Sequence, residues 1–325
     1  MKSSRILAVG IAATVALTAA VHAADTTNYP QRPIRLVMPN APGSSNDTLA
    51  RLVAVKLGEA LGQQIVIDNR AGAGGIVGME IGKNAAPDGY TLVGASTAAM
   101  SIAPHIHSKL PYDPIKDYEY ISMFGVTPNV LVVNPTLPPK SVKEFVDWAK
   151  AKGSGLNMAS AGAGAQSHLT GAALMVAAGI TSTHVPYKGG GASVAAVVAN
   201  ESQWTITPAP AVMSLVRSGR LRALGQSLPQ RTPLLADMPS VGETVKGFKY
   251  SGWNGLLAPK GTPKPILNKV REALIKATAS PDLREQFANQ GAIIQTSTPD
   301  EFRELVRQEI REIAPVVKAA GLKVE

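Results

Sequence analysis

The chain has 325 residues, of which 45% are hydrophobic and 17% are charged, which is typical of a globular protein with room for two domains. It contains no cysteine, which excludes structural disulfides, thiolate metal sites and a lipid-anchored cysteine. The formal net charge is +9, but aromatic residues make up only 5% and no run of Lys or Arg occurs, so nucleic acid is not an expected partner. An anionic small molecule, an acidic partner or a membrane surface is compatible with this charge.

The first residues are typical of a secretory signal peptide. Lys2 and Arg5 precede an apolar stretch over residues 6–20, and small residues surround a cleavage site after Ala23. The apolar stretch is too short for a comfortable membrane span. We therefore expect residues 1–23 to be removed. This removes two of the 32 basic residues, so the mature chain has 30 basic and 23 acidic residues and a net charge of +7. The mature protein is expected in the periplasm, and not as a lipoprotein.

A strand, a loop and a helix follow one another between residues 34 and 62. Residues 34–38 are an apolar strand, residues 39–47 form a loop rich in Pro, Gly and Ser, and the helix has apolar residues at i, i+3 and i+4. Ser45 or Asn46 is expected to cap this helix. The free N–H groups and the positive dipole end of such a helix make an anion site. A loop that only turns the chain would have the same composition.

Two further strands of the first half end in glycine-rich or hydroxyl-bearing loops. The second strand leads into the turn at 69–75, but Val77 stands where a dinucleotide-binding G-x-G-x-x-G fingerprint needs its last glycine. Residues 91–95 form a third strand that ends at Ser96 and Thr97. In an open parallel sheet these loops share the carboxyl edge, where ligands bind.

The same strand–loop–helix unit recurs in the second half. Residues 156–159 form the strand, residues 160–167 the loop, and the helix from about Ser167 is expected to bury one face. We assign Leu169, Ala172, Ala173 and Val176 to that buried face. Two such helix N-termini on separate domains would face each other across a cleft.

Extended stretches connect the two halves. Residues 121–126 and 130–133 are expected as two strands broken by Pro128, and residues 250–258 return the chain to the first domain. Three helices then close the sequence, from about Pro265, Asp282 and Thr298. The expected lobes are therefore residues 29–127 plus 252–325 (lobe 1) and residues 128–251 (lobe 2).

Two helix starts have a capping signature. Ser141 with Glu144 and Thr298 with Glu301 both place a hydroxyl at the N-cap and a carboxylate three residues later. This pattern predicts helices that begin at these positions.

The histidines do not form an obvious catalytic or metal site. His22 leaves with the signal peptide, and His105 with His107 provides too few ligands for a metal. His168 is expected as a hydrogen-bonding residue of the cleft wall, and His184 as strand packing. There is no G-x-S-x-G elbow or phosphate-binding P-loop, so we expect neither an enzyme nor a metal protein. An exported hydrolase-like or lyase-like enzyme is the alternative.

Two other positions have more than one interpretation. Asp47 and Arg51 are spaced i, i+4 on one helix, which favours a structural ion pair. Tyr187 either stacks on a ligand or covers the cleft, and we favour the ligand contact.

A series of short motifs spans essentially the whole mature chain. The motifs are Pro42-Gly43 with Asp47 and Arg51, Asn69 to Gly75, Pro87 to Leu92, Leu110 to Pro114, Ser160, Gly162 and Gly164 with His168-Leu169, His184 to Gly189, Gly219 to Leu224, and Ala258 to Pro263. In number and order they resemble the periplasmic substrate-binding receptors of tripartite tricarboxylate transporters, the Bug/TctC-type proteins.

The resemblance implies an α/β protein with the type II periplasmic-binding-protein fold, also called the Venus-flytrap fold, with two lobes and a hinge of two crossover strands. Family members close on a carboxylate, which they hold with backbone amides, small hydroxyl side chains and bridging waters. The implied partners are a di-, tri- or aromatic carboxylate and the membrane permease subunits of a tripartite tricarboxylate-type transporter. A sensor that reports to a membrane kinase would use the same cleft. No cofactor is expected, and the protein is expected to be a monomer.

Three departures from the family pattern affect the far end of the ligand. Ser44 replaces a usual glycine, and Ala165 replaces a common serine. Residues 192–203 lack the usual Asp and Gly-Gly and have Ala196, Ala199-Asn200 and Gln203 instead. The known ligand of any one family member therefore cannot be assigned to this chain. The predicted ligand-binding residues are Ala41, Gly43, Ser44, Ser45, Asn46, Gly74, Ser96, Thr97, Ser160, Ala161, Gly162, Gly164, Ala165, His168, Tyr187 and Thr207.

Overall fold

The computed structural model describes residues 28–235, 238–319, 321 and 322. The predicted signal peptide and its cleavage site lie outside these residues. Within them, no helix is long and apolar enough to cross a membrane.

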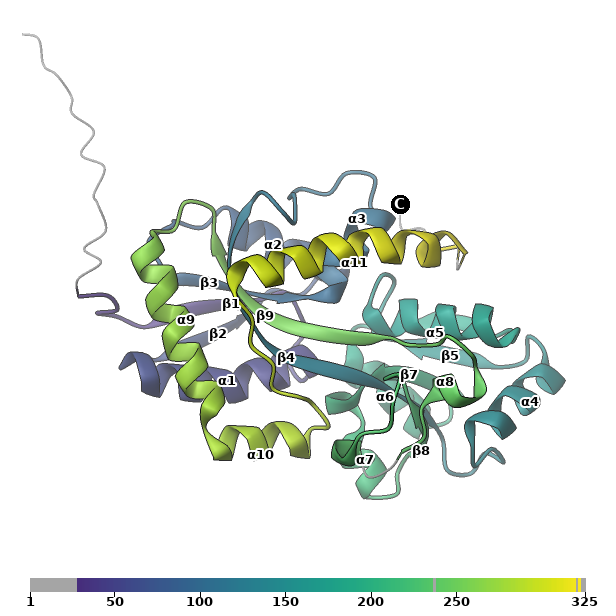
Figure 1. Cartoon of the computed structure of the whole chain (residues 1–325). Coiled ribbons are helices and arrows are strands. Elements are labelled where there is room, and N and C mark those ends of the chain that lie inside the picture. Colours follow the sequence, from purple (N-terminus) through teal and green to yellow (C-terminus); the bar gives the residue numbers. More distant parts are fainter. Residues whose placement is uncertain (1–27, 236–237, 320, 323–325) are drawn as a thin grey trace, which may run out of the picture.

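The strands form one mixed sheet that runs through both lobes of an α/β fold (Figure 1). The strand order is β2-β1-β3-β9-β4-β7-β5-β6, and β8 also pairs with β4. The strands are β1 (Ile34–Met38), β2 (Ile65–Asn69), β3 (Thr91–Ser96), β4 (Tyr118–Val133), β5 (Asn157–Ser160), β6 (Thr183–Pro186), β7 (Trp204–Pro208), β8 (Arg222–Gln226) and β9 (Ser251–Pro259).

Helices cover both faces of the sheet. They are α1 (Ser45–Leu61), α2 (Ile76–Lys83), α3 (Ala103–Ile106), α4 (Val142–Lys152), α5 (Gln166–Ala178), α6 (Gly190–Val198), α7 (Met213–Arg217), α8 (Val241–Thr244), α9 (Lys264–Ala279), α10 (Pro281–Asn289) and α11 (Pro299–Ala319). Short helical turns lie at η1 (Ala73–Gly75), η2 (Ala98–Ile102), η3 (Ala209–Ala211) and η4 (Pro233–Leu235).

Each lobe has its own apolar core. In the first lobe, Leu49 of α1 and Leu274 of α9 pack in one buried cluster, and Phe302 of α11 packs in another. In the second lobe, Phe145 of α4 and Trp204 of β7 pack edge to face with ring centroids 5.2 Å apart. This arrangement is the predicted two-lobed periplasmic-binding-protein fold. The lobe boundaries at residues 127/128 and 251/252 stay a prediction.

Strands β4 and β9 join the lobes and run side by side between them in Figure 1. They pair antiparallel from Tyr118 opposite Pro259 to Pro128 opposite Ser251. The prediction of two strands broken at Pro128 is wrong, since β4 is continuous. Pro128 lies where β4 exchanges β9 for β7 as its partner, beginning at Asn129. A residue without an N–H is tolerated at such a point because no continuing ladder needs its donor.

The capping predictions are confirmed at Thr298 and in part at Ser141. Thr298 Oγ1 accepts from the Glu301 N–H at 3.2 Å, and the Thr298 N–H donates to Glu301 Oε2 at 2.8 Å. Ser141 Oγ accepts from the Glu144 N–H, but the Glu144 carboxylate accepts from the Lys140 N–H, one residue earlier than predicted. The helix begins correctly because one of the two reciprocal bonds is sufficient.

The prediction for α5 is wrong at Val176, whose side chain is 55% exposed. Leu169, Ala172 and Ala173 are buried as expected. Helix α5 is apolar on nearly every side, so its sequence periodicity does not select which residues face the core.

Helix α11 connects the lobes a second time. Its Ile313 and Val317 belong to the same buried cluster as Leu169 and Ala172 of α5. One turn earlier, Glu309 Oε2 accepts from Trp253 Nε1 at 2.6 Å and from Ser101 Oγ at 2.7 Å. Burial raises the pKa of Glu309 to about 7, more than these two donors lower it. The carboxyl group is therefore partly protonated at neutral pH.

We expect Glu309→Gln to change how stability depends on pH. A raised pKa in the folded state means that the stability of the wild type is highest below the ordinary pKa of Glu and is lost as pH rises through about 7. The loss should approach about 3 kcal/mol, at 1.36 kcal/mol per pKa unit. The variant should therefore be more stable than the wild type at alkaline pH, but not at acidic pH, in chemical denaturation. Glu285→Gln, at an exposed position of α10, serves as the control, because Glu312 on the same helix itself contributes to the raised pKa of Glu309. Parallel pH profiles for the wild type and Glu309→Gln would contradict this prediction.

Candidate functional site

A cavity of about 690 Å³ lies between the lobes. The first lobe contributes the loop after β1, the glycine-rich turn after β2 and the end of α3. The second lobe contributes the loop before α5, the loop after β6 and the end of β7. The residues that line it are Pro39, Asn40, Ala41, Ser44, Ser45, Asn46, Ala71–Gly75, Ala98, His107, Ala161–Ala163, Ala165–Ser167, Tyr187–Gly190, Thr207 and Pro208.

Helix α1 begins at this cavity. Its N-cap is Ser44, whose Oγ accepts from the Asp47 N–H at 3.3 Å, and not Ser45 or Asn46 as predicted. Ser44 has the extended backbone of an N-cap (φ −70°, ψ 161°), whereas Ser45 and Asn46 already belong to the first helical turn. The N–H groups of Ser45 and Asn46 therefore have no partner within the helix, and both residues line the cavity.

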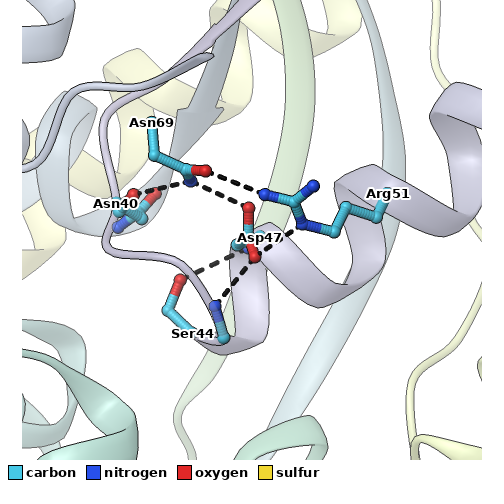
Figure 2. A network of polar contacts seen from close by, with 6 residues as sticks. Asn40, Ser44, Asp47, Arg51 and Asn69 are labelled. Carbon is cyan, nitrogen blue, oxygen red and sulfur yellow. Dashed lines mark hydrogen bonds and ion pairs between the residues drawn. The ribbon is translucent and has the colours of Figure 1, made fainter. Parts of the chain in front are cut away.

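A buried carboxylate holds the loop before α1 in place (Figure 2). Asp47 is 2% exposed and accepts from the Gly43 N–H at 2.8 Å, Arg51 Nε at 2.9 Å and Asn69 Nδ2 at 2.8 Å. The predicted Asp47–Arg51 ion pair is confirmed. Asn69 also donates to Asn40 O at 3.0 Å, which ties the loop to the end of β2.

Neighbouring donors compensate the charge of the buried Asp47 carboxylate. Burial raises its pKa, but the hydrogen bonds from Arg51, Asn69 and Gly43 together lower it more, so the pKa lies below its ordinary value. Asp47 is thus ionised at neutral pH, and Arg51 balances its charge. The nearby amides of the first turn can face an anion without a net repulsive charge behind them.

Helix α5 also begins at the cavity. Its N-cap is Ala165, which has no side chain able to cap the helix. The first-turn N–H groups of Gln166 and Ser167 therefore have no intrahelical or N-cap partner, and both residues line the cavity. Helices of 17 and 13 residues, one from each lobe, begin at the same cavity.

The cavity wall is neutral to basic. Among the described residues, no Asp or Glu lines it, and Lys188 is the one Lys or Arg that does. His107 also lines it, and burial lowers the pKa of this imidazole. The two lobes approach each other here, since Ser45 Oγ lies 3.5 Å from Pro208 O.

The structure brings ten of the sixteen predicted ligand-binding residues to the cavity wall. These are Ala41, Ser44, Ser45, Asn46, Gly74, Ala161, Gly162, Ala165, Tyr187 and Thr207. Their contact with a ligand stays a prediction.

The other six lie outside the lining. The Gly43 N–H is used by Asp47, the Gly164 N–H donates to His168 Nδ1, and Thr97 Oγ1 accepts from the Trp253 N–H. Ser160 is 0% exposed, and Ser96 is buried on β3. These donors and acceptors are turned toward the protein interior, which local sequence does not reveal. The residues placed outside are Gly43, Ser96, Thr97, Ser160, Gly164 and His168.

Several lining residues were missed by the sequence prediction. The signal for the turn at 71–75 and for Lys188 was present, since both belong to the motifs Asn69 to Gly75 and His184 to Gly189. His107 was considered in the sequence only together with His105, as an incomplete metal site. In the structure His105 Nε2 lies 2.6 Å from Ile310 O. Within the described residues, no three His, Asp or Glu side chains gather as a metal site.

Replacing Asp47 should destabilise the loop that precedes α1 more than it destabilises the rest of the lobe. Asp47→Ala leaves three donors without their acceptor and should cost roughly 3 kcal/mol at neutral pH, since hydrogen bonds to a charged group are worth about 1.5–3 kcal/mol. Because the pKa of Asp47 is lowered in the folded state, its contribution is present above the ordinary Asp pKa and is lost as pH falls through the folded value. Denaturation curves of the wild type and the variant should therefore converge in acid.

Asp147→Ala is the matched control, since it breaks the exposed i,i+4 pair with Lys143, and an exposed ion pair contributes far less to stability than a buried one. Equal losses for the two variants at neutral pH would show that the buried contacts of Asp47 contribute no more than a surface ion pair.

Three comparisons with known proteins place the chain in a family. The model of the tripartite tricarboxylate transporter family receptor matches residues 49–322. Protein BugT of Bordetella pertussis is 36% identical over 328 residues, with 100% of each chain covered.

Two solved structures share the fold. An R. palustris protein solved with adipate superposes with a TM-score of 0.88 at 28% identity, covering 91% of this chain and 99% of that one. MatC from Rhodopseudomonas palustris, solved with bound malate, has a TM-score of 0.83 at 31% identity, and the match covers 89% of this chain and 100% of that one. The chain therefore belongs to the tripartite tricarboxylate transporter receptor family, a family of solute-binding receptors.

Proposed function

We propose that this receptor captures a small organic carboxylate in the interlobe cavity. The observation that carries the proposal is that two helix N-termini, from different lobes, line one cavity whose wall has no acidic side chain in the described part of the chain. First-turn amides and the positive dipole end both favour an anion. The relatives solved with adipate and with malate support the same class of ligand.

The binding free energy must come from several groups together. Each helix terminus contributes about 0.3–1 kcal/mol, or up to ~2 kcal/mol when partly buried. Micromolar affinity needs about 8 kcal/mol. Hydroxyls and amides of Ser44, Ser45, Asn46 and Thr207 are available in the wall for the remainder.

The same geometry supports closure of the lobes. Strands β4 and β9 join the lobes, and α11 packs on α5 between them. A rotation about the strand pair would open the cavity and leave the main apolar cluster of each lobe intact, while the contacts between α11 and α5 shift. We propose lobe boundaries at 127/128 and 251/252, and closure on the ligand. The loaded protein would act in the periplasm and present the carboxylate to the membrane permease subunits of a tripartite tricarboxylate-type transporter; a sensor kinase is the alternative partner.

An enzyme is the less favoured function. Ser160 Oγ and His184 Nε2 share a hydrogen bond of 2.6 Å, which is the contact of a nucleophile with its base. Ser160 is fully buried, however, and lies outside the cavity lining. A hydroxyl that cannot reach the ligand cannot attack it, so we propose binding without chemistry.

Isothermal calorimetry of the mature protein against mono-, di- and tricarboxylates, neutral sugars and amines tests the ligand class. We expect at least one di- or tricarboxylate to bind with micromolar or better affinity, about 8 kcal/mol, and to be recovered unchanged. Binding of sugars or amines alone would contradict the proposal, and turnover of the bound carboxylate would favour the enzyme.

A matched pair of variants at Ala163 tests the charge of the ligand. Ala163 lines the cavity and is exposed, so a larger side chain there does not disturb the core. Ala163→Asp adds a negative charge and Ala163→Asn a side chain of the same shape without one. We expect Asp to weaken carboxylate binding at least tenfold relative to Asn, about 1.4 kcal/mol. Equal affinities in calorimetry would place the anion elsewhere.

A further inference from the structure

Two imidazoles lie stacked behind the loop that precedes α5. His168 of α5 and His184 of β6 have ring centroids 3.6 Å apart and ring planes 8° from parallel. His168 Nδ1 accepts from the Gly164 N–H at 3.2 Å, and His184 Nε2 shares its 2.6 Å hydrogen bond with Ser160 Oγ. The pair therefore contacts the loop at both of its ends.

The loop between these two contacts forms part of the cavity wall. Ala161, Gly162, Ala163 and Ala165 line the cavity, whereas Ser160 and Gly164 lie behind them. The Gly162 N–H donates to Ser160 Oγ at 3.2 Å, so the hydroxyl that His184 contacts also orients a lining residue. The backbone path of the wall thus depends on two histidines that do not line the cavity.

The surroundings keep both rings neutral. Strands β5 and β7 and helix α6 contain no titratable residue, and α5 and β6 contain only these two histidines. The titratable groups on adjoining segments are Glu309 and Glu312 of α11, His105 and His107 at α3, and Tyr187 and Lys188 after β6. None of them bonds to either ring among the described contacts. Burial lowers the pKa of both histidines. A positive charge on His184 lowers the pKa of His168 further, to about 4.

We propose that His168 and His184 are positioning residues: a neutral stacked pair that holds the Ser160–Ala165 loop in the shape that receives the ligand. The inference rests on the proposed function, in which this loop faces the carboxylate. His168 can accept from Gly164 only while Nδ1 carries no proton. A proton on Nδ1 would place two N–H groups against each other and release one end of the loop.

A pair of substitutions at His168 separates positioning from packing. Asn carries an acceptor oxygen at the position of Nδ1 and does not titrate, whereas Leu fills similar space without an acceptor. With adipate and malate as probes at neutral pH, we expect His168→Asn to bind within about threefold of the wild type, and His168→Leu to bind at least tenfold more weakly, a factor of ten being 1.4 kcal/mol. His105→Gln, which removes a histidine outside the pair, should bind as the wild type does. Wild-type affinity in His168→Leu, or equal losses in the Asn and Leu variants, would overturn the proposal.

A second measurement needs no ligand. In a ¹H–¹⁵N NMR titration of the wild-type protein, the Gly164 amide should shift with the His168 ring, with a midpoint near pH 4, and should not shift in His168→Asn. A Gly164 amide that ignores this titration, or a ring that titrates near its ordinary value of about 6.5, would overturn the proposal. If neither adipate nor malate binds the wild type and no other carboxylate does, the proposed function fails, while the Gly164 titration still decides whether the pair holds the loop.

Discussion

Every α-helix leaves the N–H groups of its first turn without partners inside the helix, and the candidate site depends on where two such turns lie. In α1, Ser44 satisfies one of these groups and leaves those of Ser45 and Asn46. In α5, Ala165 has no side chain able to cap the helix; its carbonyl accepts from the His168 N–H, which leaves the N–H groups of Gln166 and Ser167. The lobes bring both turns to one cavity, and in the proposed function the N–H groups that each helix cannot use bind the anion.

The charges around the cavity are compatible with an anion, since no acidic side chain and one Lys, Lys188, line it among the described residues. Asp47 lies directly behind the first turn of α1, but Arg51 and two neutral donors compensate its charge. His168 and His184 lie behind the second loop as neutral rings. Among the described residues no Lys or Arg is buried, and all but Lys188 lie outside the cavity lining. A field from such surface charges is screened by salt.

The sequence predicted the elements that local patterns determine. The strands over residues 34–38 and 91–95, the glycine-rich loops and the closing helices lie where apolar periodicity and caps placed them. The errors concern groups whose partners are distant in sequence. Pro128 does not end a strand, because β4 changes its pairing partner there. The Ser160 hydroxyl does not line the cavity, because it is hydrogen-bonded to His184. A pattern identifies a loop with free amides, but the tertiary partners decide which amides stay free.

A crystal structure of the mature protein with the carboxylate that binds best in calorimetry tests the central claim most directly. The account predicts one carboxylate group between the lobes, within hydrogen-bond distance of the first-turn amides of α1 (Ser45 or Asn46) and of the loop or first turn of α5 (Ala163 to Ser167). A carboxylate bound to one lobe alone by side-chain cations, or bound outside this cavity, would contradict it.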